Sequence, residues 1–394
     1  MWWRLDQIVG RFEKQLALDK VEMDGLMGGL RKALDDSSDP TKETFDPHAA
    51  GAAADRIVVR LGNNKPAVQA VIKQAGTAFE KAAETARGLV ATSWLEDLVP
   101  RYRKVGLETD AVRVERAVKS RSAEAKSEMK RISVPVDIPE EELIAYADKV
   151  AGSSMEQGLS RIVFAALARE DKIRKMVEEA STVAPLMSRI AVTIINDDGF
   201  TDAVIGSVEA DKEGRCIKQA ADNFNFLAPL LNMLFQRVKD KHGITLDGLG
   251  SHIMKSPFFP AGREKLLRLG LAAWLNDDPE TAIHFLVPQV EAACRDLIEA
   301  AGISVRKANH PSVGGSRVIG LGEVLVSSVF KEGNIKDAGF HLRALYADPR
   351  GFNLRNKLCH GLATESILGR GVANLVVHSI LLIADIRVTS RDPA

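Results

Sequence analysis

The sequence predicts an all-α protein. Apolar residues recur with the 3.6-residue period of a helix throughout the 394-residue chain, whereas alternating β-branched runs are nearly absent. Ala, Leu, Glu, Lys and Arg dominate, and these residues have high helix propensity. Hydrophobic residues make up 45% of the chain and aromatic residues only 5%, which excludes the disordered and fibrous classes.

Charge and cysteine usage limit the function classes. The 53 Lys and Arg residues balance 53 Asp and Glu residues, so bulk electrostatic coating of nucleic acid or an anionic membrane is excluded, and any such partner must be engaged locally. We expect no membrane partner. The cysteines, Cys216, Cys294 and Cys359, show no disulfide or CxxC spacing, which indicates a reducing cytoplasm. The eight histidines lack ligand spacing, so we expect no metal and no cofactor.

The N-terminal region, 1–134, is predicted to be helical and repeat-like. Residues 2–16 carry a helical stripe of apolar residues, and residues 35–54, dense in Asp, Ser and Pro, form the first break. The Ala-rich pattern that follows is typical of antiparallel helical hairpins, although no fixed 34-residue period exists. We expect these helices to offer a surface for a protein partner.

Residues 101–131 carry ten basic side chains against five acidic ones. A nucleic-acid track is one interpretation. A solvated helix face with i,i+4 ion pairs is favoured, because aromatic residues do not interleave the basic ones. The Pro-containing segment 132–142 then marks a domain boundary. It opens a helical middle region, 135–265, with no catalytic spacing.

Residues 266–394 predict a compact unit of five helices. Asp278 and Pro279 are an N-cap and first-turn pair that starts the first helix, and Gly302 ends it. A Gly/Ser-rich loop over 310–322 follows, and helical pattern resumes at 322–330, 336–346, 353–368 and 372–388. The last of these is the longest apolar stretch. Asn374, His378 and Asp385 interrupt it, which favours a buried helix over a membrane span.

One segment, 348–363, has the pattern of a functional site. Asn353 suits the N-cap of a helix, so that Arg355 and Asn356 occupy the first turn, where an anion such as phosphate is stabilised. At about 100° per residue, Asn353, Asn356 and His360 share one face, opposite an apolar stripe of Leu354, Leu358 and Leu362. Gly361, within that helix, would permit a second helix to approach closely.

Arg355-Asn356-Lys357-Leu358-Cys359-His360-Gly361 resembles the RNxxxHG signature of an uncharacterised helical domain found in bacteria and eukaryotes, and it fits the broader Arg-x4–6-His motif of the HEPN superfamily. The helix 280–300 and the segment 321–325 are similar to the first two helices of that domain. The resemblance covers about residues 265–394 and implies a C-terminal HEPN-like helical bundle.

The resemblance implies a homodimeric endoribonuclease that needs no metal. A ribose 2′-OH would attack the adjacent phosphate and leave a 2′,3′-cyclic phosphate. His360 would act as general acid or base, Arg355 would stabilise phosphate charge, and Asn356 would orient His360 or the phosphate. RNA is the expected partner, and a bacterial member would belong to a toxin or anti-phage defence system.

Further residues are expected around this motif. Glu291 and Arg295 form an i,i+4 pair that either supports the site from behind or is a surface salt bridge. Asn353 and Lys357 are candidate substrate-binding residues. Lys336, Arg343, Arg350, Arg355 and Lys357 outnumber Asp337 and Asp348, a local positive bias suited to a phosphate chain.

One other interpretation of the motif remains. The motif could be a buried hydrogen-bonded network that fixes a helix terminus, in a dimeric scaffold or partner-binding protein without catalysis. That alternative predicts a buried His360. Cys359 is expected to be a small core residue, not a nucleophile, because it faces about 100° away from His360. His341 and His378 are expected to be core residues.

Overall fold

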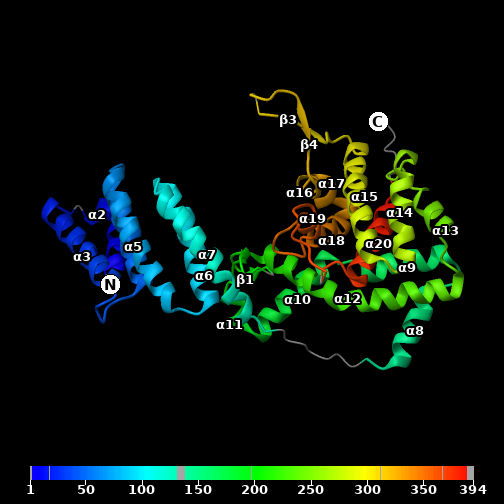
Figure 1. Cartoon of the computed structure of the whole chain (residues 1–394), viewed down its shortest axis with the longest axis horizontal. Helices are drawn as coiled ribbons and strands as arrows, with labels where there is room; N and C mark the ends of the chain where they lie inside the picture. Colours follow the sequence, from blue (N-terminus) through cyan, green and yellow to red (C-terminus); the bar gives the residue numbers. More distant parts are fainter. Residues whose placement is uncertain are drawn as a thin grey trace. The chain divides into compact units, whose positions relative to one another are not determined.

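A computed structural model describes residues 2–16, 18–130, 138–196, 198–310, 312–365 and 367–387 (Figure 1). Helix accounts for 72% of the structure, and the sheets in the described residues are two small two-stranded ones, so the predicted all-α class is confirmed. The chain forms two compact units. Unit 1 contains residues 1–134 and 193–202, and unit 2 contains residues 135–192 and 203–394.

Unit 1 is built from helices that pack in sequence order. They are α1 (Trp2–Arg11), α2 (Glu13–Leu16), α3 (Lys20–Ser38), α4 (Pro47–Leu61), α5 (Lys65–Thr85), α6 (Gly88–Val105) and α7 (Glu108–Glu128). From α3 to α7 each helix packs against the next one. Leu30, Leu34 and Ile57 fill one apolar cluster, and Leu95, Tyr102 and Val114 fill another.

Helix α7 caps both ends of the α5–α6 turn. Arg121 donates from Nη2 to the carbonyl oxygens of Ala83 and Glu84, each at 2.8 Å, at the end of α5. The Glu128 carboxylate accepts from the backbone N–H of Gly88 at 2.8 Å, at the start of α6. These contacts satisfy backbone groups that a helix leaves unpaired at its termini.

Ion pairs occupy part of the basic tract 101–131. Arg103 pairs with Glu115 at 2.6 Å, Arg113 with Glu80, and Arg121 with Glu124 at 2.5 Å. The tract is therefore partly salt-bridged, as the favoured interpretation requires, but these pairs are i,i+3 or join separate parts of the chain, and none of them has the expected i,i+4 spacing. Arg131 lies outside the described residues, as does most of the segment 132–142 that was expected to separate domains.

The helices of unit 2 enclose one hydrophobic core. They are α8 (Glu140–Ala151), α9 (Met155–Ala166), α10 (Glu170–Val183), α11 (Pro185–Arg189), α12 (Lys212–His242), α13 (Leu246–Ile253), η1 (Ala261–Arg263), α14 (Glu264–Leu275), α15 (Pro279–Ala300), α16 (Leu321–Leu325), α17 (Ser328–Lys331), η2 (Gly333–Ile335), α18 (Lys336–Tyr346), α19 (Leu354–Cys359) and α20 (Arg370–Ala384).

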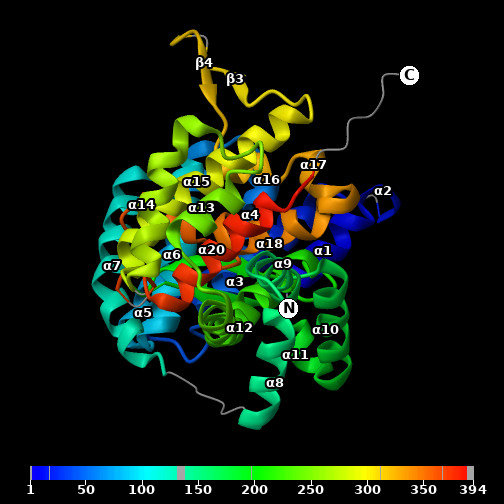
Figure 2. The ribbon, with the colours of Figure 1, turned by 90° about the vertical axis from the view of Figure 1, so that its right-hand side faces the viewer.

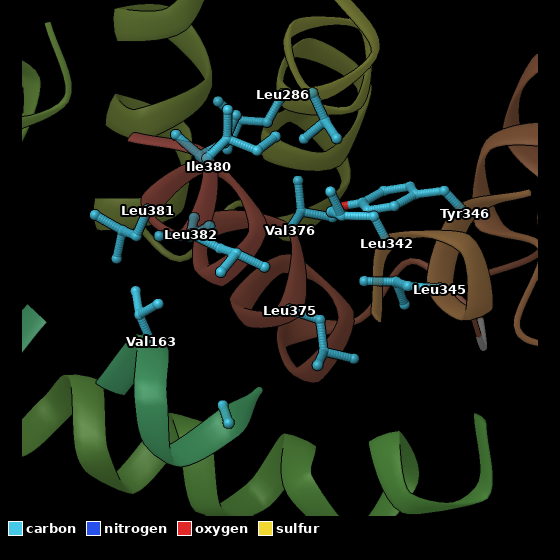
Figure 3. Close-up of a cluster of buried hydrophobic side chains, with 14 of the residues drawn as sticks. Val163, Leu286, Leu342, Leu345, Tyr346, Leu375, Val376, Ile380, Leu381 and Leu382 are labelled. Carbon is cyan, nitrogen blue, oxygen red and sulfur yellow. The ribbon is translucent and has the colours of Figure 1, made fainter. Parts of the chain in front are cut away.

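Helix α20 is the centre of this core (Figure 3). Every residue of α20 from Ala373 to Ala384 is buried, and the helix packs against α9, α12, α15 and α18. The predicted buried helix at the end of the chain is therefore confirmed. The sequence placed a boundary between residues 265 and 266, but α12 from the middle region contacts α20 directly, so the core continues across that point.

Two histidines lie in this core, as expected. The rings of His341 and His378 are fully buried, with their centroids 4.9 Å apart. His341 Nδ1 accepts a hydrogen bond from the Ala168 N–H at 3.1 Å, and His378 Nε2 lies 3.1 Å from the Val163 carbonyl oxygen. Burial lowers the pKa of both imidazoles, that of His378 to about 4.

The sequence did not predict the strands. β1 (Val192–Ile195) pairs with β2 (Thr201–Ile205), and residues 193–202 of this segment belong to unit 1. β3 (Arg306–Ala308) pairs antiparallel with β4 (Ser316–Val318); β3 follows the predicted helix end at Gly302, and β4 lies within the predicted Gly/Ser-rich loop. The β3–β4 hairpin projects from the helices of its unit (Figure 2).

Among the described residues, helices are too short or too polar to cross a membrane. The most apolar helix, α20, is fifteen residues long, below the roughly 20 that a span requires.

Candidate functional site

The predicted motif lies on α19, a helix shorter than expected. The segment 353–368 was predicted to be one helix, but α19 ends at Cys359, and Leu362, predicted to face the core, is 56% exposed. Leu354 is fully buried and anchors the helix, and the Phe352 N–H donates to the Ala344 carbonyl at 2.8 Å. With six residues α19 has fewer than two turns, so its dipole contributes little to anion binding.

Gly361 ends α19 and does not lie inside it. Its φ is +69°, in the left-handed region that favours glycine. The Leu362 N–H donates to the Lys357 carbonyl at 2.8 Å, and the Gly361 N–H donates to the Leu358 carbonyl at 3.3 Å. These two bonds are those of a Schellman motif, with His360 as the C-cap residue. The motif glycine is therefore required by the turn that presents His360.

Asn353 occupies the predicted N-cap position but does not cap through its side chain. Its backbone is left-handed, with φ 55° and ψ 33°, and no described backbone N–H donates to its side chain. Its Oδ1 instead accepts from Asn356 Nδ2 at 2.8 Å. The side chain is thus committed to positioning Asn356.

A buried carboxylate joins two arginines at the site. Glu291 of α15 is only 7% exposed, and it accepts from both Arg295 and Arg355. The Arg355 Nε donates to Glu291 Oε2 at 2.8 Å, and Nη2 donates to Oε1 at 3.4 Å. The interpretation of Glu291 and Arg295 as a surface salt bridge is therefore wrong, because the carboxylate is buried and shared with the motif arginine.

Hydrogen bonds run in one direction through the motif. Arg355 Nη1 donates to Asn356 Oδ1 at 3.3 Å, and Asn356 Nδ2 donates to Asn353 Oδ1. The Asn356 side chain is therefore occupied by Arg355 and Asn353, and in this structure it orients Arg355 rather than His360. Three of the five guanidinium N–H groups of Arg355 are used by Glu291 and Asn356, which leaves two for an anionic ligand.

His360 is exposed at the end of α19. Its backbone N–H donates to the Asn356 carbonyl at 3.0 Å, and its ring hydrogen-bonds to no other described side chain. This exposure contradicts the buried His360 that a purely architectural motif requires. Cys359 is also exposed, so the expectation that it is a core residue is wrong.

Lys357 faces an aromatic ring of the preceding loop. Its Nζ lies 6.0 Å from the centroid of the Phe352 ring, within the range of a cation–π contact. Lys357 is half-buried, and its carbonyl oxygen accepts two of the turn hydrogen bonds, from Leu362 and Ala363. Lys357 thus helps to hold the site, and its ammonium group stays within a few ångströms of the loop before α19.

A buried aspartate fixes the loop before α19. From the sequence, this residue was expected only to offset part of the positive charge near the motif. Asp348 accepts from Arg350 Nη2 at 2.8 Å and from Arg343 Nη2 at 2.9 Å. Although burial raises the pKa of Asp348, the hydrogen bonds from Arg350 and Arg343 bring it below its usual value. Glu213 and Asp211 also pair with these arginines.

The local positive charge expected around the motif is therefore reduced by ion pairs. Ion pairs with carboxylates of unit 2 are formed by Arg343, Arg350 and Arg355. The spacing of Arg350, two residues after Asp348, is the sequence signal that could have identified this cluster, since a side chain there can fold back on the aspartate.

Clusters of three or more metal-ligating side chains are absent from the described residues. In comparisons with known proteins, no family model, curated protein or solved structure matches the chain. The protein is thus defined by its own chemistry: an all-α chain that carries an anchored arginine, a hydrogen-bonded asparagine and an exposed histidine on one short helix.

Proposed function

We propose that the protein is a metal-independent endoribonuclease of the HEPN type. The observation that supports this function best is the contrast within one motif: Arg355 is held by the buried Glu291, whereas His360, five residues later, is exposed. A phosphate needs a fixed positive group, and a proton-transfer group must reach its substrate.

Each residue has a role in this proposal. Arg355 offers two N–H groups to a phosphate oxygen and stabilises the charge that develops there. His360 removes the proton from a ribose 2′-OH or donates one to the leaving 5′ oxygen, because an imidazole ring can both accept and donate a proton. The 2′ oxygen bonds to phosphorus as the 5′ oxygen leaves, which yields a 2′,3′-cyclic phosphate. Asn356 and Asn353 position Arg355.

A homodimer through unit 2 would supply the second proton-transfer group. One histidine serves either as acid or as base in a single step, so two copies of α19 facing each other would provide both. The exposure of His360 and Cys359 at the surface of the unit is compatible with such an arrangement.

The test uses purified protein, single-stranded and structured RNA, and EDTA. Cleavage that leaves cyclic phosphate ends is expected, with a loss of at least about 100-fold in His360→Ala, the usual contribution of general acid–base catalysis. Lys331→Ala, a basic residue of α17 in the same unit, is the control and should cleave normally. The proposal fails if the wild type does not cleave RNA, or if His360→Ala cleaves at the wild-type rate.

A non-catalytic scaffold is the alternative that one observation favours. Arg355 is paired with the buried Glu291, as expected of a network that only fixes a helix, although the exposure of His360 counts against such a network. This alternative predicts that Arg355→Ala lowers thermal stability or dissociates a dimer, while His360→Ala changes neither property. Measuring melting temperature and oligomeric state in both variants separates it from the ribonuclease.

A further inference from the structure

Helix α1 of unit 1 buries Val9 and packs Trp3 against the core, and it leaves a second apolar stripe exposed. Trp2, Leu5, Ile8, Phe12 and Leu16 are each between 41% and 55% exposed, and we call these five residues the α1 face. They follow helical spacing, and the Phe12 carbonyl accepts from the Leu16 N–H at 2.9 Å, which continues the helical path into α2. An amphipathic helix ordinarily buries such a stripe.

A buried ion pair fixes this orientation. Asp6 is fully buried, and its carboxylate accepts from Arg56 Nε at 2.5 Å and from Arg60 Nε at 2.9 Å, both on α4. Gly10 leaves room for the Arg56 guanidinium, which lies 3.3 Å from where a Cβ would stand. Because a buried carboxylate must keep its partners, α1 cannot rotate to bury its apolar face.

The outward side of α1 is apolar and basic. Asp6 is the only acid of α1, and it is buried, whereas Arg4 and Arg11 are exposed. They lie four residues before and three residues after Ile8, so they form one flank of the α1 face. Arg11 also lies over the Phe12 ring, with its Cζ 5.8 Å from the centroid.

We propose that the α1 face binds an anionic lipid surface. Trp, Phe and Leu on one side with arginine beside them are the composition of helices that lie in a membrane interface. An exposed helix face needs no complementary groove when its partner is a deformable bilayer. The zero net charge from which we expected no membrane partner averages over the chain, whereas this face is locally basic.

A second copy of the chain fits this face less well. In an antiparallel two-fold pair of α1 helices the same flanks meet, so Arg4 and Arg11 of one copy would oppose those of the other. Like charges directly opposed in this way disfavour the pair.

The experiment measures sedimentation of the full chain with vesicles of phosphatidylcholine, alone or in equimolar mixture with phosphatidylglycerol. Binding is expected only with the anionic lipid. Arg4→Gln/Arg11→Gln should weaken it roughly 30-fold, the factor that two basic residues contribute at an anionic surface. Leu5→Ser/Phe12→Ser should abolish it. The control, Val59→Ser/Val112→Ser, changes two other exposed residues of unit 1 and should bind normally.

Three outcomes would overturn the proposal. The first is that the wild type does not bind anionic vesicles, and the second is that the Leu5→Ser/Phe12→Ser variant binds them as well as the wild type does. The third is that the wild type self-associates without binding vesicles and that the Leu5→Ser/Phe12→Ser variant does not self-associate. The last result would assign the α1 face to an interface between copies. Circular dichroism of every variant verifies that loss of binding is not loss of fold.

Discussion

Arg355 and Glu291, 64 residues apart in sequence, are joined by a 2.8 Å hydrogen bond from Nε to Oε2. This contact ties the motif helix α19 to the longer helix α15, and it brings Arg295 to the same carboxylate. A buried carboxylate with two guanidinium partners is costly to remove, because its loss leaves both arginines without their counter-charge. Arg355 therefore stabilises the packing of α19 on α15 and is also the candidate phosphate-binding residue.

Replacement of Glu291 by glutamine should destabilise the protein. Glu291→Gln keeps the shape but removes the charge that balances Arg295 and Arg355, so we expect a loss of about 1–3 kcal/mol in the free energy of unfolding at pH 7. Urea titration measures it. Glu323→Gln is the matched control, since Glu323 also accepts from two cations, Lys307 and Arg317, but on the surface. An equal loss in both variants would contradict a special role for burial.

Substitution of the motif glycine should cost stability through the backbone. Gly361 has open space where the Cβ of an alanine would stand, but its φ is +69°, so Gly361→Ala should lose about 1 kcal/mol, from strain and not from a clash. Gly369→Ala serves as the control, because that glycine also has open space but a φ of −77°. Chemical denaturation of both variants provides the comparison, and a neutral Gly361→Ala would refute the role of the turn.

The helices that begin or end in strong local signals could be predicted from the sequence. Asp278 and Pro279 mark the start of α15, and Asp278 accepts from the Thr281 N–H as an N-cap does. The polar residues that interrupt the last apolar stretch favoured a buried helix over a membrane span, and α20 is buried. The end of α19 was missed because Gly361 was assigned to a helix interior, although glycine after a periodic apolar run is also a stop signal.

Contacts between distant elements could not be predicted. The sequence placed Glu291 beside Arg295 through helical spacing, but its contact with Arg355 depends on how α15 and α19 pack. Strands β3 and β4 have three residues each, too few to show a period of two. The α1 face was visible as a stripe, but only the pairing of Asp6 with Arg56 and Arg60 reveals that it faces outward.

Removal of the Asp348 charge should loosen the loop that leads into α19. Asp348→Asn leaves Arg343 and Arg350 without their shared carboxylate, and we expect a loss of about 2–4 kcal/mol at pH 7. Because the folded pKa of Asp348 lies below its usual value, its stabilising effect is present above about pH 4 and is lost as the pH falls through the folded pKa. The difference between wild type and variant should therefore persist from pH 7 to pH 5. Thermal melts across this range measure the difference. If it vanished by pH 5, the stabilising role assigned to the Asp348 carboxylate would be contradicted.

The two buried histidines should make the protein lose stability in mild acid, at pH values above those at which carboxylates ordinarily titrate. Burial holds the pKa of His378 at about 4, against an ordinary value of 6.5, and lowers that of His341 as well. Between these values the unfolded chain binds protons that the folded chain does not, so stability falls as the pH drops from 6.5 toward 4. For His378 alone the loss approaches about 3 kcal/mol.

The neutral state of His341 is also required by geometry. Its Nδ1 accepts from the Ala168 N–H, and a protonated imidazole has no acceptor nitrogen. Urea titrations at pH 7 and pH 5 should show a large drop in the wild type and a smaller one in His378→Phe, even though that variant loses the contact with Val163 at both values. His310→Phe, on the exposed β3–β4 turn, is the control and should retain the full drop. An identical drop in wild type and His378→Phe would show that other groups cause the acid sensitivity.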